Sequence, residues 1–171
     1  SGSFCSTGSL QHTPCSAGTV QPVAEQPTCV ACDAGSFMSE SGQTACFECV
    51  AGSFCEAGAS APQPCPEGSF SSTPGLGSSG QCTSCPEGSF CSTGALNHSQ
   101  CSAGTVQPSQ QQGRCDSCEA GKYQHLPGLT ACFGCLAASF CVEGASAALP
   151  CPEGTFSSTP GLGSESQCTT C

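Results

Sequence analysis

The stretch Cys65-Pro-Glu-Gly-Ser-Phe-Ser-Ser-Thr-Pro-Gly-Leu-Gly-Ser78 contains the pattern that predicts the fold. It begins with a cysteine, which is followed by a glycine three positions later and by an aromatic residue two positions after the glycine. Glycine tolerates a positive φ angle, so Gly68 allows the chain to reverse sharply. Residues 68–71 then predict a short strand, and the Pro74-Gly75 pair predicts a turn at its end. The stretch therefore predicts a small unit of turn, strand and loop.

The pattern Cys-x-x-Gly-x-aromatic recurs along the whole chain. It begins at Cys15, Cys32, Cys49, Cys65, Cys85, Cys101, Cys118, Cys135 and Cys151. The aromatic position falls at Phe4, Val20, Phe37, Phe54, Phe70, Phe90, Val106, Tyr123, Phe140 and Phe156, with valine as the substitute twice. Ala138 replaces the glycine once. Successive aromatic positions are 16 or 17 residues apart, with one step of 20, and this regularity indicates an array of short repeats.

A longer repeat encloses the short one. Every cysteine of the first half recurs 86 positions later, and residues 70–78 return unchanged at 156–164. We therefore divide the chain into a first cysteine-rich block, residues 1–85, and a second copy, residues 86–171, each with five units of about 17 residues. No segment shows helical periodicity, so short β-hairpins and loops are expected.

The composition indicates that disulfides, rather than a large core, stabilise the fold. Of 171 residues, 20 are cysteine, 9 are phenylalanine, one is tyrosine and none is tryptophan. Burial of so few large side chains, at about 1.5–3 kcal/mol each, cannot offset the ordering of the backbone. We expect a small disulfide-rich fold: an elongated, solenoid-like array of short cysteine-rich hairpin and loop units without a large hydrophobic core. Such cysteine usage also indicates an extracellular or cell-surface protein.

The charge excludes several classes of partner. Arg114 and Lys122 are the only basic residues other than histidine, against twelve acidic ones, and the formal net charge is −10. A surface that binds nucleic acid needs clustered cations, so nucleic acid is not expected as a partner. Direct contact with an anionic membrane is disfavoured for the same reason, and no apolar run approaches the ~20 residues that span a bilayer.

Two disulfide patterns fit the cysteine spacing. In the simple pattern, the cysteine that begins each unit pairs with the next available one. This gives Cys15–Cys29, Cys32–Cys46, Cys49–Cys55, Cys65–Cys82, Cys85–Cys91, Cys101–Cys115, Cys118–Cys132, Cys135–Cys141 and Cys151–Cys168. A crossed alternative joins Cys32 to Cys49 and Cys46 to Cys55. We favour the simple pattern, in which a loop of about 15 residues stabilises the fold by about 3 kcal/mol.

The simple pattern leaves Cys5 and Cys171 single. A further copy after Cys171 would present its own Cys5 at the spacing of Cys85 and Cys91. We therefore expect both residues to pair with adjacent copies of the 86-residue block.

A metal site is the other use of such cysteines. The spacing Cys29-x2-Cys32-x13-Cys46-x2-Cys49 is similar to that of a zinc ribbon. Cys55 and Cys65 would then lack partners, and no calcium loop of the D-x-D-x-D-G type is present. We therefore expect no metal ligands and no cofactor.

The units resemble ephrin-receptor-like cysteine-rich repeats of the GCC2/GCC3 type, which are similar in style to the modules of TNF receptors. The resemblance covers the whole chain, and its clearest matches are residues 118–135 and 151–171. It implies a stalk or spacer architecture in extracellular proteins. The Phe-Cys steps at Phe54-Cys55 and Phe140-Cys141 depart from the plain family pattern.

Two kinds of glycosylation are predicted. Asn97-His98-Ser99 is an N-glycosylation sequon between Cys91 and Cys101. The Ser/Thr-rich loops are candidate O-glycosylation sites at Ser71, Ser72, Thr73, Ser157, Ser158 and Thr159.

Catalysis is not expected. No histidine stands in a recognisable pairing with a nucleophile, and the cysteines are assigned to disulfides. The favoured function is a structural repeat segment of an extracellular rod or filament that self-associates and carries glycans. The alternative is a spacer or ligand-binding ectodomain of a receptor or adhesion protein that contacts other extracellular proteins.

Overall fold

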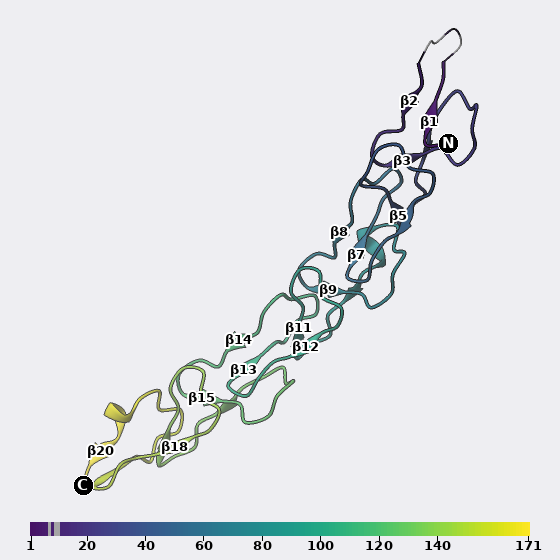
Figure 1. Cartoon of the computed structure of the whole chain (residues 1–171). Coiled ribbons are helices and arrows are strands. Elements are labelled where there is room, and N and C mark those ends of the chain that lie inside the picture. The colour runs from purple at the N-terminus through teal and green to yellow at the C-terminus, as the bar shows by residue number, and fades with distance from the viewer. Residues whose placement is uncertain (7, 9–10) are drawn as a thin grey trace. The chain divides into compact units, whose positions relative to one another are not determined.

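The computed structural model describes residues 1–6, 8 and 11–171. These residues form ten antiparallel hairpins of two-residue strands, and they contain no α-helix (Figure 1). The hairpins pair β1 (Ser3–Phe4) with β2 (Thr13–Pro14), β3 (Thr19–Val20) with β4 (Val30–Ala31), β5 (Ser36–Phe37) with β6 (Phe47–Glu48), β7 (Ser53–Phe54) with β8 (Gln63–Pro64), β9 (Ser69–Phe70) with β10 (Thr83–Ser84), β11 (Ser89–Phe90) with β12 (Ser99–Gln100), β13 (Thr105–Val106) with β14 (Asp116–Ser117), β15 (Lys122–Tyr123) with β16 (Phe133–Gly134), β17 (Ser139–Phe140) with β18 (Leu149–Pro150), and β19 (Thr155–Phe156) with β20 (Thr169–Thr170). Two 3-10 turns, η1 (Ser79–Gln81) and η2 (Glu165–Gln167), complete the elements. The predicted array of small disulfide-rich hairpins is confirmed.

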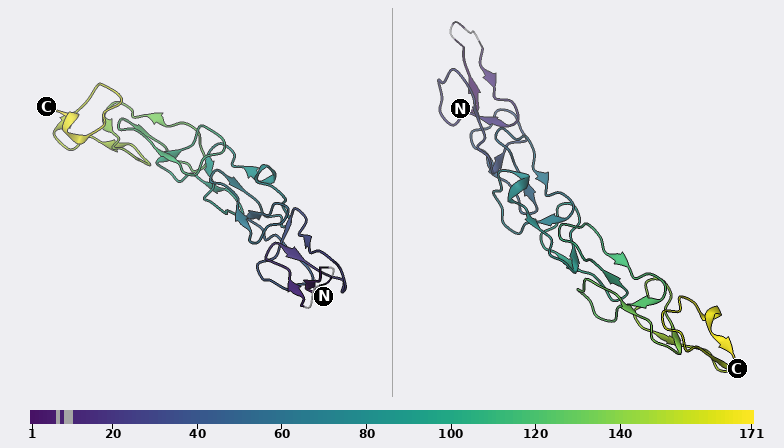
Figure 2. Two further views of the ribbon diagram at one scale, coloured as in Figure 1. Left: turned by 90° about the horizontal axis from the view of Figure 1, so that it is seen from above. Right: turned by 180° about the vertical axis from the view of Figure 1, so that it is seen from behind.

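The chain folds into two compact units whose boundary differs from the boundary of the sequence repeat. The first unit contains Ser1–Thr83 and Thr93–Asn97, and the second contains Ser84–Ser92 and His98–Cys171. Five residues of the second copy therefore belong to the first unit. Within each unit the hairpins follow one another in chain order, as the colours in Figures 1 and 2 show.

The two strands of a hairpin differ in burial. The first strand places its apolar residue inward, as at Val20, Phe54 and Phe140, which are 7 %, 7 % and 8 % exposed. The second strand is exposed in every hairpin. An isolated two-stranded hairpin is at best marginally stable, so these hairpins need their disulfides and their neighbours.

The core consists of small separate clusters. Val20 packs with Met38 and Cys32, against half-buried Cys46. Phe54 packs likewise with Leu76 and Cys65, against half-buried Cys82. Cys32–Cys46 and Cys65–Cys82 are disulfides of the following hairpin, so the inward residue of one hairpin covers the disulfide of the next. The expectation of a fold without a large core is confirmed.

The turn glycines have the positive φ angle that the sequence predicts. Gly35 has a φ of 91°, and a Cβ atom there would lie 2.4 Å from the carbonyl oxygen of Gly75. Gly75 belongs to the hairpin after next, so hairpins approach one another too closely for a side chain. Ala138, the single replacement, keeps the same conformation with a φ of 62°.

Candidate functional site

Nine disulfides stabilise the described hairpins, and each belongs to a single hairpin. They are Cys15–Cys29, Cys32–Cys46, Cys49–Cys55, Cys65–Cys82, Cys85–Cys91, Cys101–Cys115, Cys118–Cys132, Cys135–Cys141 and Cys151–Cys168. These are the pairs of the simple pattern, and the crossed pairs are not formed. The four cysteines with zinc-ribbon spacing thus belong to three different disulfides. Such a set of disulfides persists in an oxidising environment.

Backbone hydrogen bonds join successive hairpins within each unit. The amide of a turn glycine donates to a carbonyl just after the inward residue of the next hairpin, as from Gly18 to Met38 at 2.7 Å. The same bond runs from Gly104 to Gln124 at 2.7 Å in the second unit. Each added hairpin therefore forms hydrogen bonds with backbone polar groups of the previous hairpin. At a free edge, those groups would be exposed to solvent.

A second set of hydrogen bonds runs in the opposite direction along the chain. The amide of a loop glycine donates to the carbonyl of the cysteine that begins the preceding hairpin, as from Gly58 to Cys32 at 2.8 Å. The equivalent bond joins Gly144 to Cys118 at 2.8 Å. Because both sets recur in both units, the bonding pattern is a property of the repeat.

Three buried glutamines close the loops of their own hairpins, and their role was not predicted from the sequence. Gln107 donates from Nε2 to the Arg114 carbonyl at 2.8 Å and accepts from the Ser109 amide at 3.1 Å. Gln21 and Gln124 make the same pair of contacts. A glutamine that directly follows the inward residue in three of the hairpins was the available sequence signal.

Cys5 and Cys171 are the two free cysteines of the described residues, and both are exposed. Their pairing with adjacent copies stays a prediction. Both thiols are accessible to a partner.

The candidate glycosylation sites differ in accessibility. Asn97 is exposed in the bend before β12, and Ser72, Thr73, Ser158 and Thr159 are exposed as well. Ser71 is only 5 % exposed, and its hydroxyl donates to the Thr73 carbonyl at 3.1 Å. Ser157 is half-buried, and its hydroxyl donates to the Thr159 carbonyl at 3.0 Å. Accessibility therefore disfavours Ser71 as an acceptor and favours the two residues that follow it.

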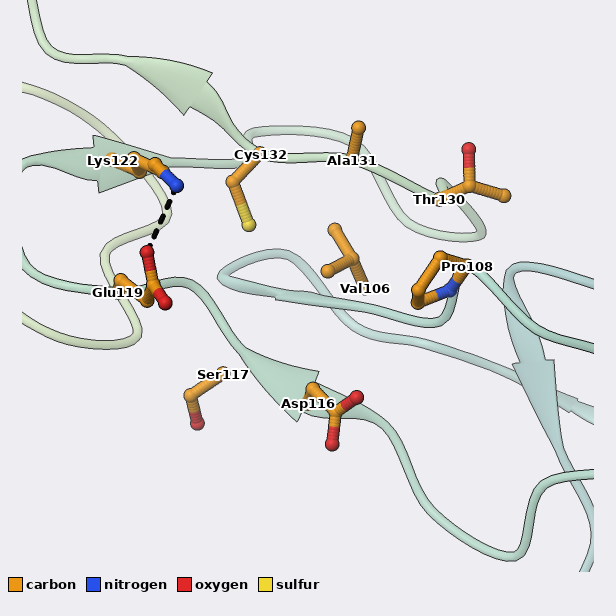
Figure 3. Close-up of a pocket in the computed structure, with 9 residues that line it drawn as sticks. All are labelled: Val106, Pro108, Asp116, Ser117, Glu119, Lys122, Thr130, Ala131 and Cys132. Atoms are coloured by element: carbon orange, nitrogen blue, oxygen red, sulfur yellow. Dashed lines mark hydrogen bonds and ion pairs between the residues drawn. The ribbon is translucent and has the colours of Figure 1, made fainter.

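A pocket of about 330 Å³ lies in the second unit (Figure 3). Val106 and Pro108 line it, together with the charged Asp116, Glu119 and Lys122. The Lys122 ammonium donates to the Glu119 carboxylate at 2.9 Å. This hydrogen bond and the positive charge of Lys122 both lower the pKa of Glu119.

Two of the three charged residues in this pocket distinguish the second copy from the first, whereas Glu119 corresponds to the equally acidic Asp33. Val30 and Ser36 stand in the first copy where Asp116 and Lys122 stand in the second. Both ion-pair partners are largely exposed, so the pair stabilises the fold little.

The described residues contain neither a metal-binding cluster nor a membrane-spanning helix. No three histidine, cysteine or acidic side chains there converge on a point that could hold a metal ion. None of the helices in that part of the chain has the length and apolar character of a membrane span.

Comparison with known proteins identifies no family. No family model matches the chain, and no curated protein matches it significantly. The structure itself shows tandem cysteine-rich repeats that fold as small β-hairpins, nine of them closed by a disulfide.

Proposed function

We propose that this chain is a structural repeat segment of an extracellular rod or filament. The observation that carries the proposal is the repetition of one hydrogen-bonding pattern, from hairpin to hairpin, in both units. A new hairpin needs only the surface that the two preceding hairpins present. Repeat proteins of this kind extend by addition, because their stability is the sum of unit and neighbour terms.

The covalent and non-covalent bonds of the fold suit a structural role. A disulfide closes a loop in nine of the ten described hairpins, and the amide-to-carbonyl bonds tie these loops to their neighbours. Local opening of one hairpin therefore leaves the chain covalently closed on both sides of it. By restricting the unfolded chain, a disulfide that closes a loop of about 15 residues stabilises the fold by about 3 kcal/mol.

An extracellular location accounts for the cysteine chemistry. Nine disulfides persist outside the cell, where thiols are not kept reduced. The exposed Asn97 of the sequon fits a glycosylated secreted protein, and a glycan there would solubilise a surface with few charges. The resemblance to ephrin-receptor-like repeats fits the same location.

The second candidate function is a spacer or ligand-binding ectodomain of a cell-surface protein. The pocket around Lys122 supports this candidate, because two of its three charged residues, Asp116 and Lys122, occur in one copy only. A binding array diversifies its copies to form a specific surface, whereas a polymer repeats one surface.

Electron microscopy of the native material separates the two functions. The structural function predicts fibres with a regular axial repeat. Monodisperse soluble monomers in the same preparation, measured by analytical ultracentrifugation, would contradict it and favour the ectodomain.

A further inference from the structure

The pocket of the second unit has an apolar centre and a charged rim (Figure 3). Val106 and Pro108 supply apolar surface, and Figure 3 shows Val106 between Pro108 on one side and the Glu119–Lys122 ion pair on the other. The pocket volume of about 330 Å³ is at the lower end of the ~300–1,000 Å³ that ligand pockets occupy. The space therefore suits a ligand about the size of one amino-acid side chain.

The strand pairing places a carboxylate beside the apolar centre. Val106 of β13 and Asp116 of β14 are direct partners in their hairpin. Cross-strand partners project from the same face, with Cβ atoms about 4.5–5.5 Å apart. Asp116 is exposed, whereas Val106 is only 8 % exposed. The carboxylate therefore stands at the edge of an apolar surface that a ligand can cover.

The rim groups that are free to bind are hydrogen-bond acceptors. Within the part of the chain that the structure describes, the Asp116 carboxylate and the Thr130 hydroxyl have no hydrogen-bond or ion-pair partner. Glu119 uses Oε2 for the Lys122 ammonium, which leaves Oε1 for a ligand. Two carboxylates against one ammonium leave one negative charge of the lining uncompensated. The rim therefore favours a cation that donates several hydrogen bonds.

The first copy has the same apolar frame without this carboxylate. Three lining residues are identical there, where they are Val20, Pro22 and Thr44. At the position of Asp116, however, the first copy has Val30, which is 57 % exposed. Because this side chain is exposed in both copies, its change alters the surface and not the core.

We propose that this pocket binds an arginine side chain, presented by a basic segment of a partner protein. A guanidinium group has five N–H donors and no acceptor, so it matches a rim of free acceptors. Its planar fork can bind the Asp116 carboxylate with two parallel hydrogen bonds, and its methylene groups can cover Val106 and Pro108. A lysine ammonium would bind less well, because it is more strongly hydrated and lacks the fork.

The charge of the whole chain favours the same class of partner. Twelve acidic residues against two basic ones give a formal net charge of −10. Such a field speeds the association of basic segments and slows that of acidic ones. Specificity requires a local feature, and in this pocket the uncompensated charge, the apolar surface and the free acceptors coincide.

The sign of the ligand's charge can be tested through two nearby cations. Lys122 lines the pocket, and Arg114 precedes Asp116 by two residues without lining it. Both repel a cationic ligand and attract an anionic one. The first copy has Ser36 and Thr28 at their positions. Lys122→Ser and Arg114→Thr should therefore strengthen the binding of arginine, whereas weaker binding in both variants would identify an anionic ligand and overturn the inference.

The test titrates the whole 171-residue chain, with its disulfides formed, with the blocked tripeptide acetyl-Gly-Arg-Gly-amide. NMR chemical shifts of the backbone amides report where the peptide binds, and saturable shifts are expected at Val106, Thr130 and Ala131. The lysine peptide should bind at least about threefold more weakly. The citrulline peptide, which has the shape of arginine without its charge, should give no saturable shift. Equal binding of the arginine and citrulline peptides, or equal shifts at acidic residues along the whole chain, would overturn the inference.

A matched pair of variants separates the pocket from net charge. Asp116→Val copies the first copy and should weaken arginine binding at least about fivefold, because it removes the bidentate partner. Asp33→Val is the control, because it makes the same chemical change at another exposed aspartate, in the first unit. It should change the affinity less than about twofold. Equal weakening in the two variants would assign the binding to net charge and contradict the inference. The intact mass of each variant verifies that its disulfides have formed.

A transplant tests whether the carboxylate is sufficient. Val30→Asp should create a second site in the first copy, beside Val20 and with Asp33 at the position of Glu119. The number of arginine peptides bound per chain should then rise from one to two, with new shifts at Val20 and Thr44. An unchanged stoichiometry would refute the assignment of binding to this carboxylate.

Free arginine tests whether the ligand belongs to a protein. Its own carboxylate is repelled by Asp116 and Glu119, so it should bind more weakly than the blocked peptide. Tighter binding of free arginine would identify an amino-acid site and overturn the protein partner.

This inference goes beyond the structural function, because it needs no self-association and gives the second candidate function a class of partner. Regular fibres in native material would leave it standing. Failure of the arginine titration would likewise leave the structural function standing.

Discussion

The buried glutamine of the second copy provides a quantitative test of how the loops are held. Gln124 is 0 % exposed, and it lies within the hairpin closed by Cys118–Cys132. Its Nε2 donates to the Ala131 carbonyl at 2.6 Å, and its Oε1 accepts from the Leu126 amide at 3.1 Å. One side chain therefore bridges both ends of the loop formed by residues 125–131.

Two substitutions separate hydrogen bonding from packing. Gln124→Ala removes both bonds and leaves a cavity, whereas Gln124→Met restores the volume and copies Met38, the buried residue at this position in the first copy. A buried group left unpaired costs about 1–3 kcal/mol, and water can reach part of this loop because Leu126 is 51 % exposed. We therefore expect the alanine variant to destabilise this hairpin by about 2–3 kcal/mol and the methionine variant to destabilise it by about 1–2 kcal/mol.

Native-state hydrogen exchange measures this effect at individual amides. Because about 1.4 kcal/mol is tenfold in an equilibrium constant, protection of the Leu126 amide should fall at least tenfold in Gln124→Ala. Gln110→Ala, a change at an exposed glutamine of the preceding loop, is the control and should leave that amide unchanged. Equal protection of Leu126 in both alanine variants would refute the bridging role of Gln124.

Three further predictions concern the turn, the ion pair and the sequon. In Gly35→Ala, a residue with a positive φ would gain a Cβ atom 2.4 Å from a carbonyl oxygen, so the variant should destabilise the first unit by at least about 2 kcal/mol in denaturant unfolding. Gly134→Ala is the control and should not destabilise the chain, because no atom lies within 4 Å of a Cβ at that position. Similar losses of stability in both variants would contradict the close-approach argument. Lys122→Ser should raise the pKa of Glu119 toward its ordinary value in an NMR titration. Because the ion pair lowers the pKa of Glu119 in the folded chain, its small contribution to folding stability is present at pH values above the pKa of Glu119 in the unfolded chain. This contribution is lost as the pH falls through the pKa of Glu119 in the folded chain. An unchanged titration would show that the pair does not form in solution. Asn97→Gln should abolish the mass loss that peptide N-glycosidase causes in chain secreted by eukaryotic cells, and a wild-type chain without any mass loss would show that the sequon is empty.

The disulfide pattern could be predicted from sequence because each pairing is local. The separation between partners is 6, 14 or 17 residues, so a cysteine meets its partner within its own turn and loop. The turn glycines were predictable for a similar reason, because a positive φ is a property of one residue and its neighbours. The repetition of the sequence extended these predictions along the chain, because a feature predicted for one 17-residue repeat applied to the other repeats.

The tertiary structure decided which residues the hairpins bury between them. Met38 and Leu76 look like ordinary loop residues in sequence, and they become core residues because the preceding hairpin places Val20 or Phe54 against them. Gln124 is also buried, although glutamine is usually exposed, and its carbonyl accepts from the Gly104 amide of the preceding hairpin. Ser71 and Ser72 are adjacent identical residues, yet only Ser72 is exposed. These outcomes depend on how neighbouring hairpins stack, which brings together residues about 20 to 40 positions apart, and local sequence contains no record of such contacts.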